Sequence, residues 1–254
     1  MSGVQLSAKY NPVHVPNALL FIIARFAMLR TMFSCVPPGW ALIFDMDGVI
    51  VDSMPMHTKA WRAYLKRMGI DSDDDLARRM HGRRNDELVA ELIAADLPAQ
   101  TVFEHGAAKE RMYREMMSPV LSAHLVPGVT EFLDACEGAP MAVATNAEPA
   151  NVDFVLDGAD LRRCFQAIVD GHQVARPKPH PDVYLRAAEL LKTPPERCIV
   201  FEDSPAGVAA ARSAGARVVG VHTHPADLSG VDLLVTDFRD PALKQWLESV
   251  ERHT

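Results

Sequence analysis

A short apolar run that ends in two acidic residues is the clearest pattern in the chain. Residues 41–44 are all apolar, and Asp45 and Asp47 follow them, with Gly48 directly after the second acid. Four apolar residues between polar neighbours predict a buried strand, because a helix would need a longer periodic segment. The strand is expected to end at the acids. Gly48 suits the turn that follows, because glycine readily adopts a positive φ.

Downstream, short apolar runs alternate with amphipathic segments. The runs predict strands at residues 141–145, 167–169, 198–201, 218–221 and 233–235. The segments between and after them predict helices at residues 129–136, 149–156, 181–191, 205–214 and 242–250. Strands that alternate with helices indicate an α/β fold, a doubly wound parallel sheet with helices on both faces.

The segment between the first two predicted strands has a different character. From residue 55 to about residue 117, apolar residues recur at helical spacing and nothing indicates a strand. The sequence therefore predicts a helical domain, residues 54–126, inserted into a catalytic core formed by residues 39–53 and 127–254. Residues 1–38 are expected to lie outside the catalytic fold and to be dispensable for its chemistry.

An apolar stretch lies within this N-terminal segment. Residues 19–29 are apolar except for Arg25, which makes the stretch too short and too polar to span a bilayer. It also lacks the small-residue cleavage site of a signal peptide. Two interpretations stay open: an additional amphipathic helix, or a start codon placed too early, with Met28 or Met32 as the true start.

Composition narrows the range of partners. The chain has 254 residues, of which 48% are hydrophobic and 23% charged, so it can bury a full core. Its formal net charge of -7 and the absence of a long basic run argue against a nucleic-acid partner, and no membrane association is expected. The cysteines show no Cys-x-x-Cys motif and are predicted to be buried, unpaired thiols in a reducing, cytoplasmic compartment; they are Cys35, Cys136, Cys164 and Cys198.

Polar residues follow three of the predicted strands, and a lysine lies in the loop before a predicted helix. They are Asp45, Asp47, Thr145, Asn146, Glu202, Asp203 and Lys178. Ligands of an open α/β sheet bind beyond the carboxyl ends of its strands, so these side chains are expected to converge on one crevice. Asp45 and Asp47 would repel each other unless a cation lies between them. Mg²⁺, which takes oxygen ligands, is the expected cation.

Each of these features also has a simpler interpretation. The acids after the first strand could form a solvated turn, and Thr145-Asn146 could cap a helix. Lys178 could be an exposed loop residue, and Glu202-Asp203 could be surface charge favoured by a helix dipole. Coincidence of all four in this order is improbable, which favours a single site.

Together the motifs resemble those of the haloacid dehalogenase superfamily of phosphohydrolases. The similarity extends from about residue 41 to residue 235, and the predicted helical insertion resembles the α-helical cap of that superfamily, whose core is Rossmann-like. The four matching motifs are Asp45-Met46-Asp47-Gly48-Val49, Thr145-Asn146, Lys178-Pro179-x-Pro181-Asp182 and Glu202-Asp203-Ser204-x-x-Gly207.

The resemblance implies a role for each motif. Asp45 would be the nucleophile that forms an aspartyl-phosphate, and Asp47 the acid that protonates the leaving oxygen and then activates water. Thr145 and the backbone N–H of Asn146 would hold the phosphoryl group, and Lys178 would neutralise its charge. The dehalogenases of the superfamily generally lack the second acid of the first motif, so a dehalogenase is not expected.

The resemblance also implies the metal ligands. Mg²⁺ would be held by Asp45, the backbone carbonyl of Asp47 and Asp203, with Glu202 nearby or in the outer coordination shell. Gly48 would belong to the phosphate-binding turn. The partner of the protein would be a small phosphorylated metabolite, and a monomer is compatible with the sequence.

The cap residues are expected to contact the leaving group. His57, Arg84 and Lys109 are the candidates, and the positions of His57 and Lys109 resemble the β-phosphoglucomutase branch; either could instead be a solvated helix residue. That branch has an arginine three residues after the glycine of its cap motif, where this chain has Asn85. A phosphatase acting on a sugar phosphate or similar metabolite is therefore predicted. The alternatives are a phosphosugar mutase and a non-catalytic binding or regulatory protein on the same scaffold.

Overall fold

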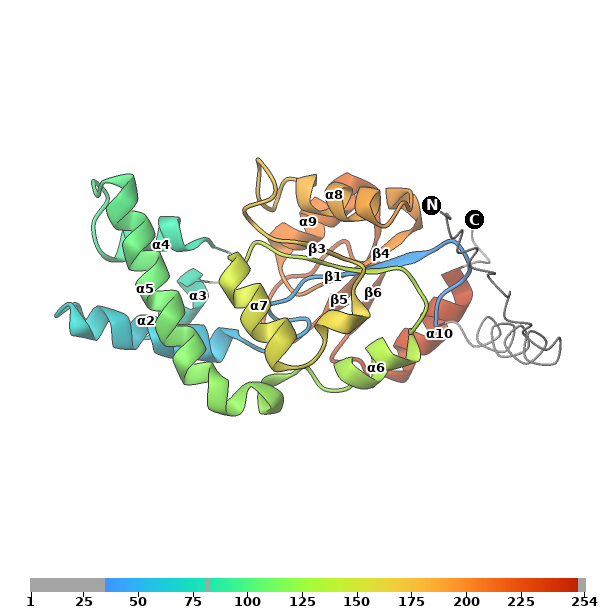
Figure 1. Ribbon diagram of the computed structural model, residues 1–254, viewed down its shortest axis with the longest axis horizontal. Helices are drawn as coiled ribbons and strands as arrows, with labels where there is room; N and C mark the ends of the chain where they lie inside the picture. The colour runs from blue at the N-terminus through green and yellow to red at the C-terminus, as the bar shows by residue number, and fades with distance from the viewer. Residues whose placement is uncertain (1–34, 81–82, 251–254) are drawn as a thin grey trace, which may run out of the picture. The chain divides into compact units, whose positions relative to one another are not determined.

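The computed structural model describes residues 35–80 and 83–250. Its sheet has the strand order β3-β2-β1-β4-β5-β6, and every neighbouring pair is parallel (Figure 1). The strands are β1 (Ala41–Phe44), β2 (Met141–Ala144), β3 (Ala167–Val169), β4 (Cys198–Glu202), β5 (Arg217–Val221) and β6 (Leu233–Val235). The strand order reverses at β1, and such a switch point opens a crevice at the carboxyl ends of the strands. The predicted α/β class and parallel sheet are confirmed.

Helices cover both faces of this sheet. Ala41 and Ile43 pack into a cluster with α8 (Asp182–Leu190) and α9 (Pro205–Ala214). Leu42 and Phe44 pack into a second cluster on the opposite face, because side chains alternate along a strand. The helices of that second face are α6 (Val129–Ala135), α7 (Pro149–Gly158) and α10 (Pro241–Ser249). β1 is therefore held rigidly from both sides, and so is the site that follows it.

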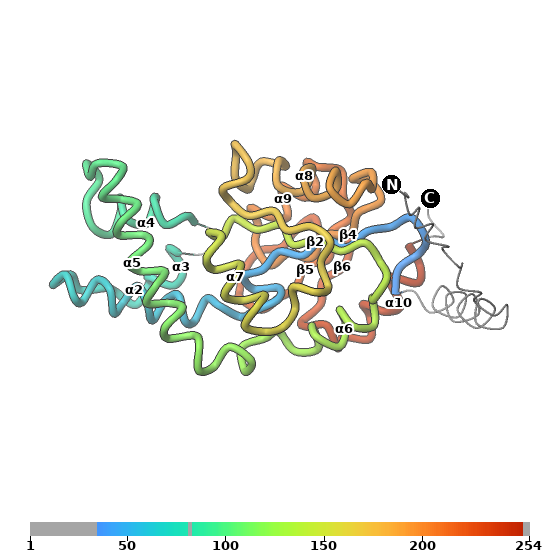
Figure 2. The backbone as a smooth tube through the Cα atoms, in the orientation of Figure 1, coloured from blue at the N-terminus to red at the C-terminus, as the bar shows by residue number. Residues whose placement is uncertain are grey.

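The insertion after β1 is helical, as predicted. It contains α2 (Met54–Arg67), α3 (Leu76–Met80), α4 (Asn85–Leu92) and α5 (Ala99–Met117), and it returns to the sheet layer through the 3-10 helix Ser118–His124 (Figure 2). It has a small core of its own, formed by Trp61, Leu65, Leu76, Met80, Leu88 and Val89. The domain boundaries proposed from the sequence stay a prediction.

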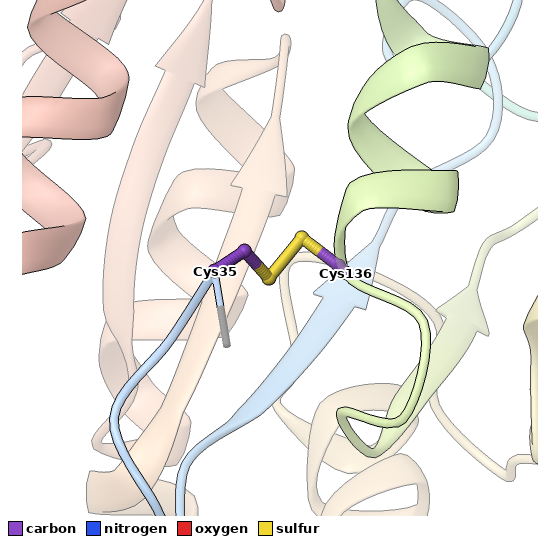
Figure 3. The surroundings of a disulfide bond; sticks show 2 residues. All are labelled: Cys35 and Cys136. Atoms are coloured by element: carbon purple, nitrogen blue, oxygen red, sulfur yellow. A yellow bond between two sulfur atoms is a disulfide. The ribbon is translucent and has the colours of Figure 1, made fainter. Parts of the chain in front are cut away.

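A disulfide joins the segment before β1 to the end of α6. It links Cys35 to Cys136 across 101 residues of sequence (Figure 3). The prediction of four unpaired thiols is therefore wrong for this pair, because nothing local in the sequence marks two cysteines so far apart as partners. Cys164 and Cys198 are free and buried, as predicted. The cytoplasmic location stays a prediction.

The structure describes the N-terminal segment from residue 35 onward. The apolar stretch at residues 19–29, Met28 and Met32 lie outside the described residues. Within the described part, Val36 and Trp40 are buried in the main core cluster. Among residues 35–80 and 83–250, no helix is both long and apolar enough to cross a membrane.

Candidate active site

Three buried carboxylates meet where β1 and β4 end. Asp45 follows β1 directly, and its backbone N–H donates to the carbonyl of Phe201 on β4, 3.0 Å away. Glu202 is the last residue of β4 and Asp203 follows it. One carboxylate oxygen from each of Asp45, Glu202 and Asp203 lies within 4.8 Å of the other two. Such close acids repel one another strongly unless cations compensate them.

Lys178 supplies one of these cations. Its Nζ lies 2.7 Å from Asp45 Oδ1 and 2.7 Å from Glu202 Oε1. Burial disfavours the charged amine, but the two carboxylates outweigh it and raise the pKa of Lys178 above its ordinary value. The lysine is therefore a buried, protonated group. The predicted alternative of an exposed loop lysine does not hold, because the residue is only 8% exposed.

The remaining charge suits a divalent metal ion. Burial raises the pKa of Asp45 to about 7, with Glu202 and Asp47 adding to the effect and Lys178 opposing it. Burial, with Glu202 and Asp45, also raises the pKa of Asp203 well above its usual range. Without a metal these carboxyls therefore tend to bind protons, which a cation would displace. A set of oxygen donors fits Mg²⁺.

Both carboxylate oxygens of Glu202 accept hydrogen bonds from other groups of the protein. Its Oε1 accepts from Lys178 and from the Tyr184 hydroxyl, which is 2.6 Å away. Its Oε2 accepts from the backbone N–H groups of Asp203 and Ser204, at 2.9 and 3.0 Å. Because both oxygens are engaged, Glu202 is better placed to orient the loop and Lys178 than to ligate a metal directly.

Two glycines make room for the carboxylates. Gly48 has φ +77, and a Cβ there would lie 1.9 Å from Asp203 Oδ2. A Cβ at Gly207 would lie 1.6 Å from Glu202 Oε1. Neither position accepts a side chain without displacing an acid. Gly48, predicted as part of the phosphate-binding turn, also allows Asp203 to approach.

Asp47 lies beside the carboxylate cluster but is not a member of it. Its Oδ1 accepts a hydrogen bond of 2.6 Å from the Ser53 hydroxyl and lies 3.8 Å from His57 Nε2. The side chain is 27% exposed, so it can exchange protons with substrate or water. The predicted metal contact through its backbone carbonyl stays a prediction.

The Thr145-Asn146 loop is hydrogen-bonded to the motif that contains Lys178. Thr145 is buried, and its hydroxyl accepts from the backbone N–H of Ala147 at 3.1 Å. Asn146 Oδ1 accepts from the backbone N–H of Lys178 at 3.2 Å. The N-cap position of α7 is held by Glu148, which makes no side-chain cap, so neither Thr145 nor Asn146 is the N-cap residue of that helix.

Nine of the eleven sequence-predicted site residues line one cavity of about 700 Å³. Its lining includes Asp45, Asp47, Thr145, Asn146, Lys178 and Asp203 from the core, and His57, Arg84 and Lys109 from the insertion. The structure thus brings the four motifs and the three cap candidates together. Glu202 and Gly48 do not line the cavity themselves. Glu202 binds Lys178, and Gly48 lies next to the Asp203 carboxylate.

The cap candidates differ in their surroundings. His57 Nδ1 lies 3.2 Å from Lys109 Nζ, and the His57 ring stacks on Tyr113 at 3.8 Å between centroids. Both His57 and Lys109 are buried, so neither is a solvated helix residue. Arg84 lies at the exposed start of α4 and pairs with Asp86 at 3.2 Å.

Sequence reasoning missed Glu110. Its Oε1 accepts from Asn85 Nδ2 at 2.6 Å and from Lys109, and its Oε2 accepts from Asn151 Nδ2 at 2.9 Å. Burial alone would raise its pKa, but Lys109, His57 and these hydrogen bonds lower it to about 2. The sequence offers one signal for Glu110: it forms a charged pair with the neighbouring Lys109 within a predicted helical segment.

Comparison with known proteins found similar sequences and a similar fold. The family model described as haloacid dehalogenase-like hydrolase matches residues 41–215. The fructose-1-phosphate phosphatase YqaB of Escherichia coli is 36% identical over 183 residues, covering 71% of this chain and 95% of that protein. The β-phosphoglucomutase of Bacillus subtilis is 30% identical over 219 residues, covering 84% and 96%. A crystal structure of β-phosphoglucomutase from Clostridium difficile superposes with a TM-score of 0.74 at 25% identity, covering 84% and 97%.

Proposed function

Because the chain belongs to the family of haloacid dehalogenase-like hydrolases, we propose that it is a Mg²⁺-dependent phosphatase acting on a small phosphorylated metabolite such as a sugar phosphate. One observation carries the proposal. The buried Asp45 carboxylate is bound by Lys178 at 2.7 Å and lines the cavity together with Asp47. A nucleophile, a proton donor and a charge-neutralising lysine are thereby within reach of one phosphoryl group.

The first half-reaction uses the two acids of the first motif. A carboxylate oxygen of Asp45 attacks phosphorus and forms an acyl-phosphate bond, while the bond from phosphorus to the ester oxygen breaks. Asp47 donates its proton to that departing oxygen, which leaves as a neutral hydroxyl. Lys178 stabilises the negative charge shared between Asp45 and the phosphoryl oxygens.

The second half-reaction returns the protein to its starting state. Asp47, now a carboxylate, accepts a proton from a water molecule as that water attacks phosphorus. The acyl-phosphate bond breaks, inorganic phosphate is released, and Asp45 recovers its carboxylate. Ser53 and His57 hold Asp47 near the cavity through contacts of 2.6 and 3.8 Å.

The residues that would hold Mg²⁺ are Asp45 and Asp203, with the Asp47 carbonyl as the third protein ligand. Glu202 would orient the loop and Lys178 through its hydrogen bonds. Bound there, the ion would neutralise charge on the phosphoryl group and on the buried acids. Thr145 and the backbone N–H of Asn146 would receive the remaining phosphoryl oxygens, because both line the cavity beside Lys178.

The runner-up activity is a phosphosugar mutase, and the relatives include both classes. A mutase must bind a second phosphate on the cap side. Asn85, which stands where the mutase branch has an arginine, donates its amide to Glu110 at 2.6 Å. It is therefore engaged by a carboxylate, and this favours the phosphatase.

The test is release of inorganic phosphate from a panel of phosphate esters with Mg²⁺ or with EDTA. We expect Mg²⁺-dependent release from at least one sugar monophosphate and from p-nitrophenyl phosphate. Conversion of β-glucose 1-phosphate to glucose 6-phosphate only in the presence of a hexose bisphosphate would favour the mutase. Absence of turnover with every ester would favour a non-catalytic binding protein instead.

A further inference from the structure

Outside the phosphoryl site, carboxylates outnumber lysines and arginines in the wall of the cavity, which also contains His57 and His172. We define this distal wall as the charged lining residues other than Asp45, Asp47, Lys178 and Asp203. Among the described residues it contains three lysines and arginines and four carboxylates. They are Arg83, Arg84, Lys109, Asp86, Glu87, Glu110 and Glu148. A leaving group held between the phosphoryl site and this wall meets no excess of lysine and arginine over carboxylates.

The central cation of the wall is already neutralised. Lys109 Nζ donates to Glu110 Oε1, and both side chains are almost completely buried. Two amides, from Asn85 and Asn151, donate to the same carboxylate at 2.6 and 2.9 Å. These donors keep Glu110 in its charged form, so Lys109 offers no free charge to a ligand.

The arginines of the wall are also paired. Arg83 binds Glu91 and lies 3.6 Å from Glu87, while Arg84 lies 3.2 Å from Asp86. A second phosphate on the substrate would bring nearly two negative charges toward these pairs. It would therefore have to displace a carboxylate from a cation or remain next to Glu110.

From this charge pattern we infer that Glu110 is a specificity-determining residue. It makes the site selective for phosphate monoesters whose leaving group is uncharged, and it disfavours bisphosphates. Glu148, which accepts from Arg114 at 2.7 Å, contributes a second, weaker repulsion from the α7 side of the cavity. The inference rests on the proposed phosphatase function and narrows its substrate class.

The test compares matched esters that differ by one phosphate. We would measure kcat/KM for fructose 1-phosphate against fructose 1,6-bisphosphate, and for glucose 6-phosphate against glucose 1,6-bisphosphate. The wild type should prefer the monophosphate in each pair it hydrolyses. Glu110→Gln should raise the bisphosphate-to-monophosphate ratio about tenfold, equivalent to about 1.4 kcal/mol of barrier. A purely structural role would lower both rates and leave the ratio unchanged.

A matched control removes the same charge elsewhere on the same helix. Glu115 lies on α5, is exposed and does not line the cavity, so Glu115→Gln should keep the ratio within about twofold of wild type. Glu148→Gln should shift the ratio in the same direction as Glu110→Gln, by a smaller factor. This second variant decides the question if Glu110→Gln fails to fold.

The outcomes separate the inference from the proposed function. Hydrolysis of monophosphates with an unchanged ratio in folded Glu110→Gln, or in Glu148→Gln where that variant must decide, overturns the inference and leaves the phosphatase intact. A wild type that prefers the bisphosphate also overturns it. A wild type that hydrolyses no ester of either kind removes the proposed function and the inference with it.

Discussion

Glu110 on α5 accepts a hydrogen bond from Asn151 on α7, with 2.9 Å between Oε2 and Nδ2. Both residues are buried, 4% and 3% exposed. Arg114, one turn further along α5, donates to Asn151 Oδ1 at 2.6 Å and to Glu148. Because α5 belongs to the insertion and α7 flanks the sheet, these contacts join the insertion to the core at the cavity that both helices line.

The first prediction concerns this connection. Asn151→Ala leaves the Glu110 carboxylate and the Arg114 guanidinium each without one partner, at a cost of about 1–3 kcal/mol. We expect kcat/KM for a sugar phosphate to fall about tenfold, because closure over the substrate becomes less favourable. Asp153→Asn, an exposed change on the same helix, is the control. Equal kinetics in the two variants would show that the connection does not govern closure.

The second prediction concerns the nucleophile. Asp45→Asn keeps the shape of the side chain but replaces a carboxylate by a weakly nucleophilic amide, so turnover should be lost. The fold should persist, because the substitution also relieves repulsion from Glu202 and Asp203. Phosphate release and thermal unfolding measure the two effects. Activity within about tenfold of wild type, a barrier change of about 1.4 kcal/mol, would remove Asp45 from this role.

The third prediction separates the phosphoryl site from the cap. Lys178→Ala should lower kcat/KM alike for a sugar phosphate and for acetyl phosphate, because Lys178 binds the nucleophile used by every substrate. Lys109→Ala removes the cation that pairs with Glu110 in the cavity wall. It should therefore reduce the rate for the sugar phosphate and barely affect acetyl phosphate, whose leaving group is too small to reach the cap. If Lys109→Ala lowers both rates equally, Lys109 acts in the core chemistry or in folding.

The sequence predicted those site residues that directly follow a recognisable strand. Asp45 and Glu202-Asp203 each end a buried apolar run, and parallel strands must bring such ends to one edge. Their convergence with Lys178 was therefore predictable, as were the strands themselves. The helical insertion was predictable from its periodicity.

Side-chain contacts that do not lie at strand ends, between segments far apart in sequence, were not predictable. Asn85, Glu110 and Asn151 come from three helices, and no local pattern distinguishes them from polar residues on a solvated face. The disulfide between Cys35 and Cys136 was not predictable for the same reason, because tertiary packing and not sequence spacing brings the two cysteines together. The steric reason for glycine at position 207 is given only by the structure, in which a Cβ there would clash with the Glu202 carboxylate.

The fourth prediction concerns pH. The pKa of Glu110 is lowered from 4.5 to about 2 in the folded protein. A lowered folded-state pKa stabilises the fold above the unfolded pKa of 4.5, and this contribution is lost as the pH falls toward 2. At neutral pH it amounts to about 3 kcal/mol.

Urea unfolding of the wild type and of Glu110→Gln at pH 7, 5, 4 and 3 measures this contribution. The difference in unfolding free energy should be constant between pH 7 and 5 and should then shrink by about 2 kcal/mol on reaching pH 3. The comparison cancels the titration of groups that do not interact with Glu110. A difference that does not vary with pH would show that Glu110 titrates alike in the folded and unfolded states.

The fifth prediction concerns the disulfide. Cys35 precedes β1 and Cys136 precedes β2, so the bond lies at the amino ends of parallel strands, whereas the site lies at their carboxyl ends. Removing it with Cys35→Ser/Cys136→Ser should therefore leave kcat unchanged. The protein should be destabilised by as much as about 4–5 kcal/mol, because a crosslink across 101 residues restricts the unfolded chain.

Reductant provides the matched control for this last variant. The wild type in dithiothreitol should show the same lowered Tm as the double variant in the absence of reductant, and the double variant itself should not respond. Equal Tm values for all samples would mean that the bond does not form or does not stabilise the fold. A fall in kcat of the folded double variant would show instead that the disulfide acts on the site through β1, which leads to Asp45, or through β2, which leads to Thr145.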